Sequence, residues 1–371
     1  MTISKMDVFV LPLKVRAVRA HGIGEVAGSI DTVLLRLEAE DGHTGWGEAA
    51  PWAVFTGTAE AAFAALDTYL RSLVIGADPT GIAGIMQQAD QALTGHPEAK
   101  AALETALLDL VGRQRNVPVW ALLGGKCRDR IPLSVSVADP DWDRDRVFVT
   151  RMVEDEGIGI LKLKTGFADH AFDVMRADDI RTRWPEIDLR IDYNQGLVPR
   201  DALRSLRDFD SMGLGFIEQP VPARQWECMA ELKSALDTPL LADESVFSAE
   251  DMLRAAQAQI ADAVSVKIMK CGGPRAGLVI ARMAEAAGWG AYGGDMFETG
   301  IAHLAGAHMI AAAPQINMGC EYYHARHHLE IDTLSKPFPD TAGTVYVPDG
   351  PGLGIGVNEE LVRSQCRLHC T

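Results

Sequence analysis

The sequence is poor in cysteine, in positive charge and in long apolar runs, and each shortage argues against a class of protein. Its 371 residues include six cysteines without paired spacing, so we expect reduced thiols and no disulfide framework. Lysine and arginine number 35 against 51 acidic residues, and the net charge of −16 argues against nucleic acid or an anionic membrane as a partner. No run reaches the roughly 18 apolar residues of a membrane span. The start also lacks a signal-peptide layout, so we expect a cytoplasmic protein.

Recognisable cofactor motifs are also scarce. No glycine-rich phosphate loop follows a first strand, which argues against an open, doubly wound sheet. Cys366 and Cys370 are close in sequence, but no second ligand pair accompanies them, so we expect no metal there. His324, His327 and His328 have a spacing that suits a metal on a helix. Their position after the last predicted strand favours a surface or subunit contact instead.

The stretch 161–270 repeats one pattern, an apolar run that ends in charge. Successive charged ends lie 24 to 28 residues apart, and they are Lys164, Asp192, Glu218, Asp243 and Lys267. A strand of about six residues, a helix of 10–15 and two short loops fill such a repeat, which is the length of a βα unit. Charge at the carboxyl ends of parallel strands is where barrel enzymes keep their chemistry.

The full set of candidate strands predicts a closed barrel. Eight strands are expected to begin near residues 132, 159, 188, 215, 239, 263, 289 and 315. Eight units of this length favour an α/β fold with a (β/α)₈-type, TIM-like barrel. The stretch is shorter than the usual ~250 residues of such a barrel, so we expect the last helix to be missing or replaced, a (β/α)₇β-type arrangement.

Three segments follow from these patterns. Residues 1–125 combine a strand hairpin, turning at Asp41-Gly42, with three helical stretches, and we expect an α+β capping domain. Residues 126–340 form the barrel, and 341–371 return to complete the cap.

Two irregular stretches of the cap, near 19–29 and 50–58, are candidate lids. The first carries three glycines, which favour a mobile loop, and the second is short and aromatic. Either is an ordinary surface turn, or it covers a site and excludes water. In the second case His21, Trp52 and Phe55 are the substrate-binding candidates.

The acids at three consecutive strand ends predict a metal site. Asp192, Glu218 and Asp243 would repel one another in one barrel mouth unless a cation lies among them. Oxygen ligands favour a hard ion, so Mg²⁺ or Mn²⁺ is expected rather than Zn²⁺. Glu244 is an alternative third ligand or a neighbour of the site, and Asn194 shares the strand parity of Asp192 and would orient it.

The lysines predict proton transfer. Lys162 and Lys164 leave the same face of one strand, and we expect mutual repulsion and the metal to lower their amine pKa so that one acts as a base. Lys267 lies almost opposite across an eight-stranded ring. Lys270 has the wrong strand parity to join Lys267 and is given only an electrostatic role.

Together these groups suit proton removal next to a carboxylate. The enediolate that results is unstable without help, and a divalent ion stabilises its charge while a lysine takes or returns the proton. A metal-free glycosidase with a carboxylate pair is a different possibility, but it has no use for the lysines.

These motifs resemble the enolase superfamily and, within it, the muconate-lactonizing subgroup, along the whole chain. The resemblance places the subgroup's Lys-x-Lys on Lys162 and Lys164, with Lys164 as acid/base, and its sixth-strand lysine on Lys267. It places the metal ligands in Ile-Glu-Gln-Pro around Glu218 and in Ala-Asp-Glu-Ser around Asp243, together with Asp192. It also implies a small carboxylate substrate and a homo-oligomer, an octamer or a dimer.

Within the subgroup, the stretch 287–298 resembles muconate cycloisomerases, whose glutamate at the Glu298 position helps hold the reacting carboxylate. The implied reaction is cis,cis-muconate to muconolactone in aromatic catabolism. One departure is Asp295, where these enzymes commonly have threonine. A carboxylate there is unfavourable beside a dianionic substrate unless it points away or is protonated.

Other members of the superfamily remain open. Dipeptide epimerases carry Asp-x-Asp in the eighth strand, where this chain reads Met318–Tyr323, and the mandelate-racemase type has a histidine after the seventh strand. The alternatives are therefore a racemase or epimerase of an amino-acid derivative (an N-acyl amino acid, a dipeptide or a proline betaine) and an o-succinylbenzoate synthase-like lyase.

Overall fold

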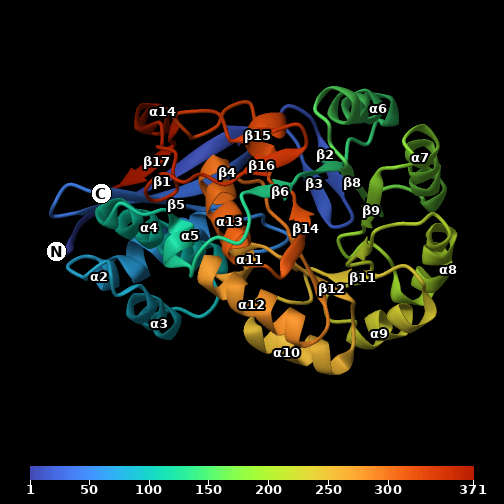
Figure 1. The fold of residues 1–371 in the computed structure, drawn as a ribbon, viewed down its shortest axis with the longest axis horizontal. Coiled ribbons are helices and arrows are strands. Elements are labelled where there is room, and N and C mark those ends of the chain that lie inside the picture. Colours follow the sequence, from blue (N-terminus) through green and yellow to red (C-terminus); the bar gives the residue numbers. More distant parts are fainter.

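Eight parallel strands in sequence order form the centre of the molecule. A computed structural model describes all 371 residues. The strands are β7 (Ser134–Val137), β8 (Ile160–Lys164), β9 (Asp188–Asp192), β10 (Ile217–Glu218), β11 (Leu240–Ala242), β12 (Ala263–Val266), β13 (Gly290–Gly293) and β14 (Ile316–Cys320). A parallel bridge between Leu133 and Cys320 brings the first and last strands together. The predicted eight-stranded barrel is confirmed (Figure 1).

Helices cover the outside of the barrel. They are α6 (Trp142–Thr150) continued by η2 (Arg151–Asp155), α7 (His170–Arg183), α8 (Pro199–Asp210), α9 (Trp226–Ala235), α10 (Ala249–Ala258), α11 (Ile268–Cys271), α12 (Pro274–Ala286) and α13 (Gly300–Ala312). Local sequence sets their starts: Ser248 and Asp251 form a capping box at α10. Between β14 and β15 the chain forms only the π-helical turn η3 (His324–His328), so no long helix directly follows the eighth strand.

A four-stranded antiparallel sheet forms the cap. Its strands, in spatial order, are β17 (Leu368–Cys370), β1 (Ile3–Lys14), β4 (Ser29–Ala39) and β5 (Thr44–Ala49). The helical elements α1 (Ala59–Ala64), η1 (Ala65–Leu70), α2 (Arg71–Val74), α3 (Ile82–Ala92) and α4 (Pro97–Arg115) share a separate hydrophobic core with this sheet. In Figure 1 the last strand, β17, lies beside the first, β1, so both ends of the chain belong to this sheet.

Glycines let helix α4 approach strand β5 closely. A Cβ on Gly47 would overlap the backbone of Ala102, and a Cβ on Gly45 would overlap the backbone of Ala106 and Leu110. The Gly-Trp-Gly sequence therefore alternates two bare positions that face the helix with Trp46, which is buried on the other face.

The stretch near 19–29 is a short hairpin rather than the loop expected from its glycines. Strands β2 (Arg19–His21) and β3 (Gly24–Val26) pair in an antiparallel register. Its turn lies on the barrel, because a Cβ on Gly22 would overlap the carbonyl oxygen of Tyr193. Gly22 therefore allows the hairpin turn to pack closely against the barrel.

Short elements join the two parts. Helix α5 (Val119–Leu122) leads into a three-stranded sheet of β15 (Asp340–Thr341), β16 (Thr344–Tyr346) and β6 (Arg130–Pro132), and α14 (Glu359–Gln365) precedes β17.

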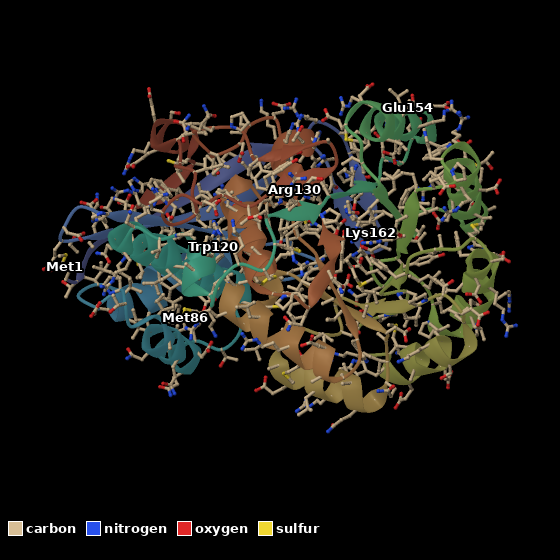
Figure 2. The ribbon with its side chains drawn as sticks, in the orientation of Figure 1. Met1, Met86, Trp120, Arg130, Glu154 and Lys162 are labelled. Carbon is tan, nitrogen blue, oxygen red and sulfur yellow. The ribbon has the colours of Figure 1, made fainter.

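All six cysteines are free. None of the helices combines the length and apolar character needed to cross a bilayer. The side chains in Figure 2 show Lys162 toward the middle of the molecule, with Met1 and Glu154 at its edges.

Candidate active site

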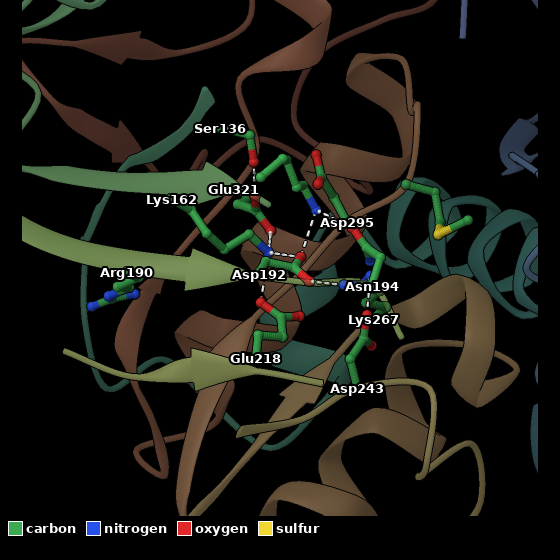
Figure 3. A network of polar contacts seen from close by, with 12 residues as sticks. Ser136, Lys162, Arg190, Asp192, Asn194, Glu218, Asp243, Lys267, Asp295 and Glu321 are labelled. Carbon is green, nitrogen blue, oxygen red and sulfur yellow. Dashed lines mark hydrogen bonds and ion pairs between the residues drawn. The ribbon is translucent and has the colours of Figure 1, made fainter. Parts of the chain in front are cut away.

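The charged strand ends meet at one mouth of the barrel. Lys162 and Lys164 are on β8, Asp192 and Glu218 end β9 and β10, and Asp243 directly follows β11. All five are buried, and Lys164 is the most exposed at 7%. Figure 3 shows the side chains of Lys162, Asp192, Glu218 and Asp243 at this mouth. Burial of so many charges is tolerable only because they pair with one another.

Lys162 lies among three carboxylates. Its Nζ is 2.7 Å from Glu218 Oε2, 2.6 Å from Glu321 Oε2 and 3.2 Å from Asp192 Oδ2. Burial alone would lower the pKa of Lys162, but these carboxylates raise it well above its usual value. The expectation of a lowered amine pKa is therefore wrong for Lys162, because attraction to the acids exceeds repulsion between the lysines.

Lys164 is hydrogen-bonded to protein groups on one side and lines a pocket on the other. Its Nζ donates to Asp192 Oδ2 at 2.5 Å and to Asn194 Oδ1 at 3.1 Å. Asn194 in turn donates to Glu244 Oε1 at 3.1 Å, and its backbone N–H donates to Asp192 Oδ1. Asn194 thus links the acid and the amine, although strand β9 ends at Asp192 and Asn194 lies beyond it.

Lys267 and Lys270 share one carboxylate. Asp243 Oδ2 lies 2.6 Å from Lys267 Nζ, and Oδ1 lies 2.8 Å from Lys270 Nζ. The parity argument against Lys270 is wrong because helix α11 begins directly after Lys267, and residues three apart share a helix face. Burial would raise the pKa of Asp243, but the two ammonium groups hold it well below its usual value. Burial would lower the pKa of Lys267, yet Asp243 and Glu218 raise it.

Gln219 fixes the loop that presents Asp243. Its Oε1 accepts from the backbone N–H groups of Asp243 and Ser245, at 3.0 and 3.1 Å. Its Nε2 donates to Ser245 Oγ and to the carbonyl of Val221. The glutamine of the Ile-Glu-Gln-Pro stretch therefore orients the acid on the neighbouring strand.

The donor set of this mouth fits a divalent cation. Glu218 Oε1 and Glu244 Oε2 are buried without a hydrogen-bond partner. Burial and the neighbouring carboxylates raise the pKa of Glu218 to about 7 and that of Glu244 to about 8. Unpartnered carboxylate oxygens suit Mg²⁺ or Mn²⁺. Asp192, Glu218 and Asp243 each contact a lysine in this structure. Their carboxylate oxygens do not all lie within 4.8 Å of one another.

A pocket lies between the barrel mouth and the cap. Three candidates from the cap line it, His21, Trp52 and Phe55, and so do Lys164, Asn194, Lys267 and Asp295 from the barrel. The free volume inside is about 30 Å³, room for only a couple of water molecules. The His21 ring meets the Trp52 ring edge-on with centroids 4.9 Å apart, and the Phe55 ring centroid lies 4.7 Å from Lys267 Nζ.

Two family models match the chain. The one described as "Enolase C-terminal domain-like" covers residues 145–361, and the one described as "Mandelate racemase / muconate lactonizing enzyme, N-terminal domain" covers residues 14–124. The chain belongs to the muconate-lactonizing subgroup of the enolase superfamily. Members of the superfamily bind Mg²⁺ through acidic residues.

Similar proteins carry different names. In the crystal structure of a muconate cycloisomerase from Azorhizobium caulinodans, the sequence is 44% identical to this chain. The match covers 99% of this chain and 98% of the other, with a TM-score of 0.86. L-Ala-D/L-Glu epimerase of Bacillus subtilis is 33% identical over 88% of this chain and 89% of its own length. N-succinyl-L-Arg/Lys racemase of Bacillus cereus is 31% identical over 95% of this chain and 94% of its own length. Isomerase or racemase activity follows at the level of the family.

Sequence reasoning missed Glu321 in this superfamily member. It directly follows β14, contacts Lys162, accepts from Ser136 and lines the pocket. The rule that singled out Asp192 and Glu218, charge at a strand's carboxyl end, would have found it.

His324 was expected at a surface or subunit contact, and that expectation is wrong. Its side chain is buried, lines the pocket and contacts Asp295. The spacing of the histidines does not reveal the buried position of His324, because His327 contacts Asp340 and not Asp295.

Asp295 and Glu298 depart from their expected places. Asp295 lines the pocket, and although burial would raise its pKa, His324 and His303 hold it well below its usual value. It therefore neither points away nor carries a proton. Glu298 does not line the pocket; its Oε1 accepts from the backbone of Met296, and its Oε2 is buried without a partner.

Proposed function

We propose that this chain is a metal-dependent isomerase that moves a proton at the carbon next to a substrate carboxylate, through an enediolate. The observation that carries the proposal is the pair Lys164 and Lys267. They come from the second and sixth strands of the barrel, which are opposite in an eight-stranded ring, and both line one pocket. A small carboxylate held between them meets an amine on each face.

The roles of the residues follow from their contacts. Lys164 takes or returns the proton, and Asp192 and Asn194 hold its amine in place. Asp192, Glu218 and Asp243 would hold Mg²⁺ or Mn²⁺, which supplies stabilisation of the negative charge on the substrate carboxylate. The cap residues Trp52 and Phe55 exclude water from the pocket.

The first specific reaction is cycloisomerisation of cis,cis-muconate to muconolactone. The 44% identity to the Azorhizobium caulinodans protein supports it. In this reaction a carboxylate closes onto the diene, and Lys164 protonates the carbon that becomes carbanionic. Lys267 is an electrostatic partner on the other face.

A second candidate is racemisation or epimerisation of an amino-acid derivative, which uses both lysines. The carboxylates of Asp295 and Glu321 line the pocket and favour it, because negative charge there opposes the second carboxylate of muconate.

Hydrogen exchange with solvent tests the proposal and separates the two candidates. With Mg²⁺ in heavy water, we expect deuterium at the carbon next to the carboxylate and a loss of about 10²–10⁴-fold in rate for Lys164→Ala. A racemase loses a comparable factor in Lys267→Ala, whereas a cycloisomerase retains measurable loss of the diene's ultraviolet absorbance. Full activity of Lys164→Ala towards a turned-over substrate would refute the proposal.

A further inference from the structure

Three buried side chains, two of which line the pocket, take no part in the proton transfer proposed above. Asp295 follows β13, His303 lies in α13, and His324 begins η3. Asp295 Oδ2 is 2.7 Å from His324 Nδ1 and 3.1 Å from His303 Nε2. His303 is fully buried, and His324 and Asp295 are each 6% exposed and line the pocket.

The shared oxygen fixes where the protons lie. A carboxylate oxygen that contacts two imidazole nitrogens accepts from both, so both imidazoles donate to Asp295 Oδ2. His324 therefore carries a proton on Nδ1. Burial lowers the pKa of His324 although Asp295 raises it, and His303 and Arg19 lower it further, which favours the neutral ring. A neutral ring with its proton on Nδ1 has a lone pair on Nε2.

Two acceptor atoms remain open to the pocket. His324 Nε2 and Asp295 Oδ1 make no hydrogen bond in the protein, and neither is sealed from the cavity. The neighbouring carboxylate of Glu321 is already engaged by Lys162 and Ser136. The free polar atoms on this wall are thus acceptors, one of them charged, and such a pair suits a group that carries N–H bonds and positive charge.

We propose that Asp295 and His324 form a subsite for an amine of the substrate, so that the substrate is a small carboxylate that also carries an N–H-bearing ammonium group. His303 is a positioning residue that holds Asp295 from helix α13. The proposal rests on the proposed function, because the same pocket places the carboxylate between Lys164 and Lys267. It selects the amino-acid class over a dicarboxylate.

Three probes that differ in one group each test the subsite on the unaltered protein. L-Proline offers a carboxylate and an ammonium with two N–H bonds, N,N-dimethylproline keeps the charge without N–H, and cyclopentanecarboxylate has neither. Titration calorimetry with Mg²⁺ present should show L-proline binding tighter than cyclopentanecarboxylate by about tenfold or more, with N,N-dimethylproline between them. Equal affinities, tighter binding of cyclopentanecarboxylate, or no binding of L-proline at 10 mM would overturn the subsite.

Matched variants assign the effect to His324. In His324→Leu, which removes the acceptor, the preference for L-proline over N,N-dimethylproline should vanish. In His324→Gln, whose amide oxygen can replace Nε2, most of the preference should return. An unchanged preference in a folded His324→Leu protein, judged by circular dichroism, contradicts the assignment. So does cobalt binding that is lost in His303→Ala, because an ion would occupy the nitrogen lone pairs.

The two proposals fail separately. The amine preference is a binding ratio measured on the unaltered protein, and it does not depend on turnover. Loss of deuterium exchange from every substrate with an intact ratio counts against the proton-transfer chemistry, whereas exchange with no amine preference counts against the subsite.

Discussion

The balance between burial and the surrounding charges decides the direction in which the pKa of a buried carboxyl group shifts. Asp192 contacts two lysines, and they hold its pKa below the usual value even though burial raises it. Glu104 is 3% exposed; its Oε2 accepts from the backbone N–H of Arg275, and its Oε1 lies 3.9 Å from the guanidinium of the same residue. Burial outweighs both contacts and raises the pKa of Glu104 to about 7.

We expect Glu104 to make the protein less stable as pH rises. The unfolded chain releases this proton near the usual glutamate pKa of 4.5, whereas the folded chain keeps it to about 7. Between these values the folded state binds more protons, so the contribution to stability is complete below pH 4.5 and is lost on the way to pH 7. A shift of this size corresponds to as much as roughly 3 kcal/mol.

The measurement is chemical unfolding of Glu104→Gln from pH 5 to pH 8. The variant should match the unaltered protein near pH 5 and exceed its stability near pH 8. Glu186→Gln, at an exposed position, is the control and should follow the unaltered protein throughout. Parallel pH curves for Glu104→Gln and the unaltered protein would contradict this account.

At the scale of elements, glycine allows two segments to approach closely because it has no side chain. Strand β5 and helix α4 approach until their backbones touch at Gly45 and Gly47. Strand β5 also carries Glu48, whose Oε1 and Oε2 accept from Thr299 at the start of α13. The position of the cap on the barrel therefore depends on the spacing of β5 and α4.

We expect Gly47→Ala to destabilise the protein by about 2 kcal/mol or more, because the added Cβ overlaps the carbonyl of Ala102. The control is Gly84→Ala in helix α3, where a Cβ meets nothing within 4 Å. That change should stabilise by roughly 0.5–1 kcal/mol. Thermal unfolding of both variants measures the difference, and a Gly47→Ala protein as stable as the parent would refute the close-approach argument.

At the scale of the whole molecule, barrel closure brings distant charges together. Lys162 on the second strand contacts Glu321 after the eighth, although 159 positions separate them in the chain. The same closure places acids from three strands at one mouth. A cation bound there would hold the folded barrel and have no equivalent site on the unfolded chain.

Addition of Mg²⁺ to chelator-treated protein should therefore raise the thermal midpoint by roughly 3 °C or more at saturating metal. The double variant Asp192→Asn, Glu218→Gln should show no rise, and Glu186→Gln should respond like the parent. Differential scanning calorimetry provides the midpoints. An equal rise in the double variant would place the ion elsewhere, and Asp295 with its two histidines would then be the alternative metal centre.

The sequence alone determined the barrel, its strand starts and the acids and lysines at the strand ends. These features are local, since a βα unit repeats its length and ends each strand in the same way, as Asp192 and Glu218 show. The capping sheet and its helices followed from periodicity for the same reason. The resemblance to the enolase superfamily rested on these local motifs and is confirmed.

Only the tertiary structure decided which charges meet. Lys270 joins Asp243 because a helix begins where strand parity was assumed to continue. His324 joins Asp295 because the ends of β13 and β14 are neighbours in the closed sheet. Contacts of this kind depend on where side chains from different strands point. A linear sequence does not show this, because closure of the barrel decides which strand ends are neighbours.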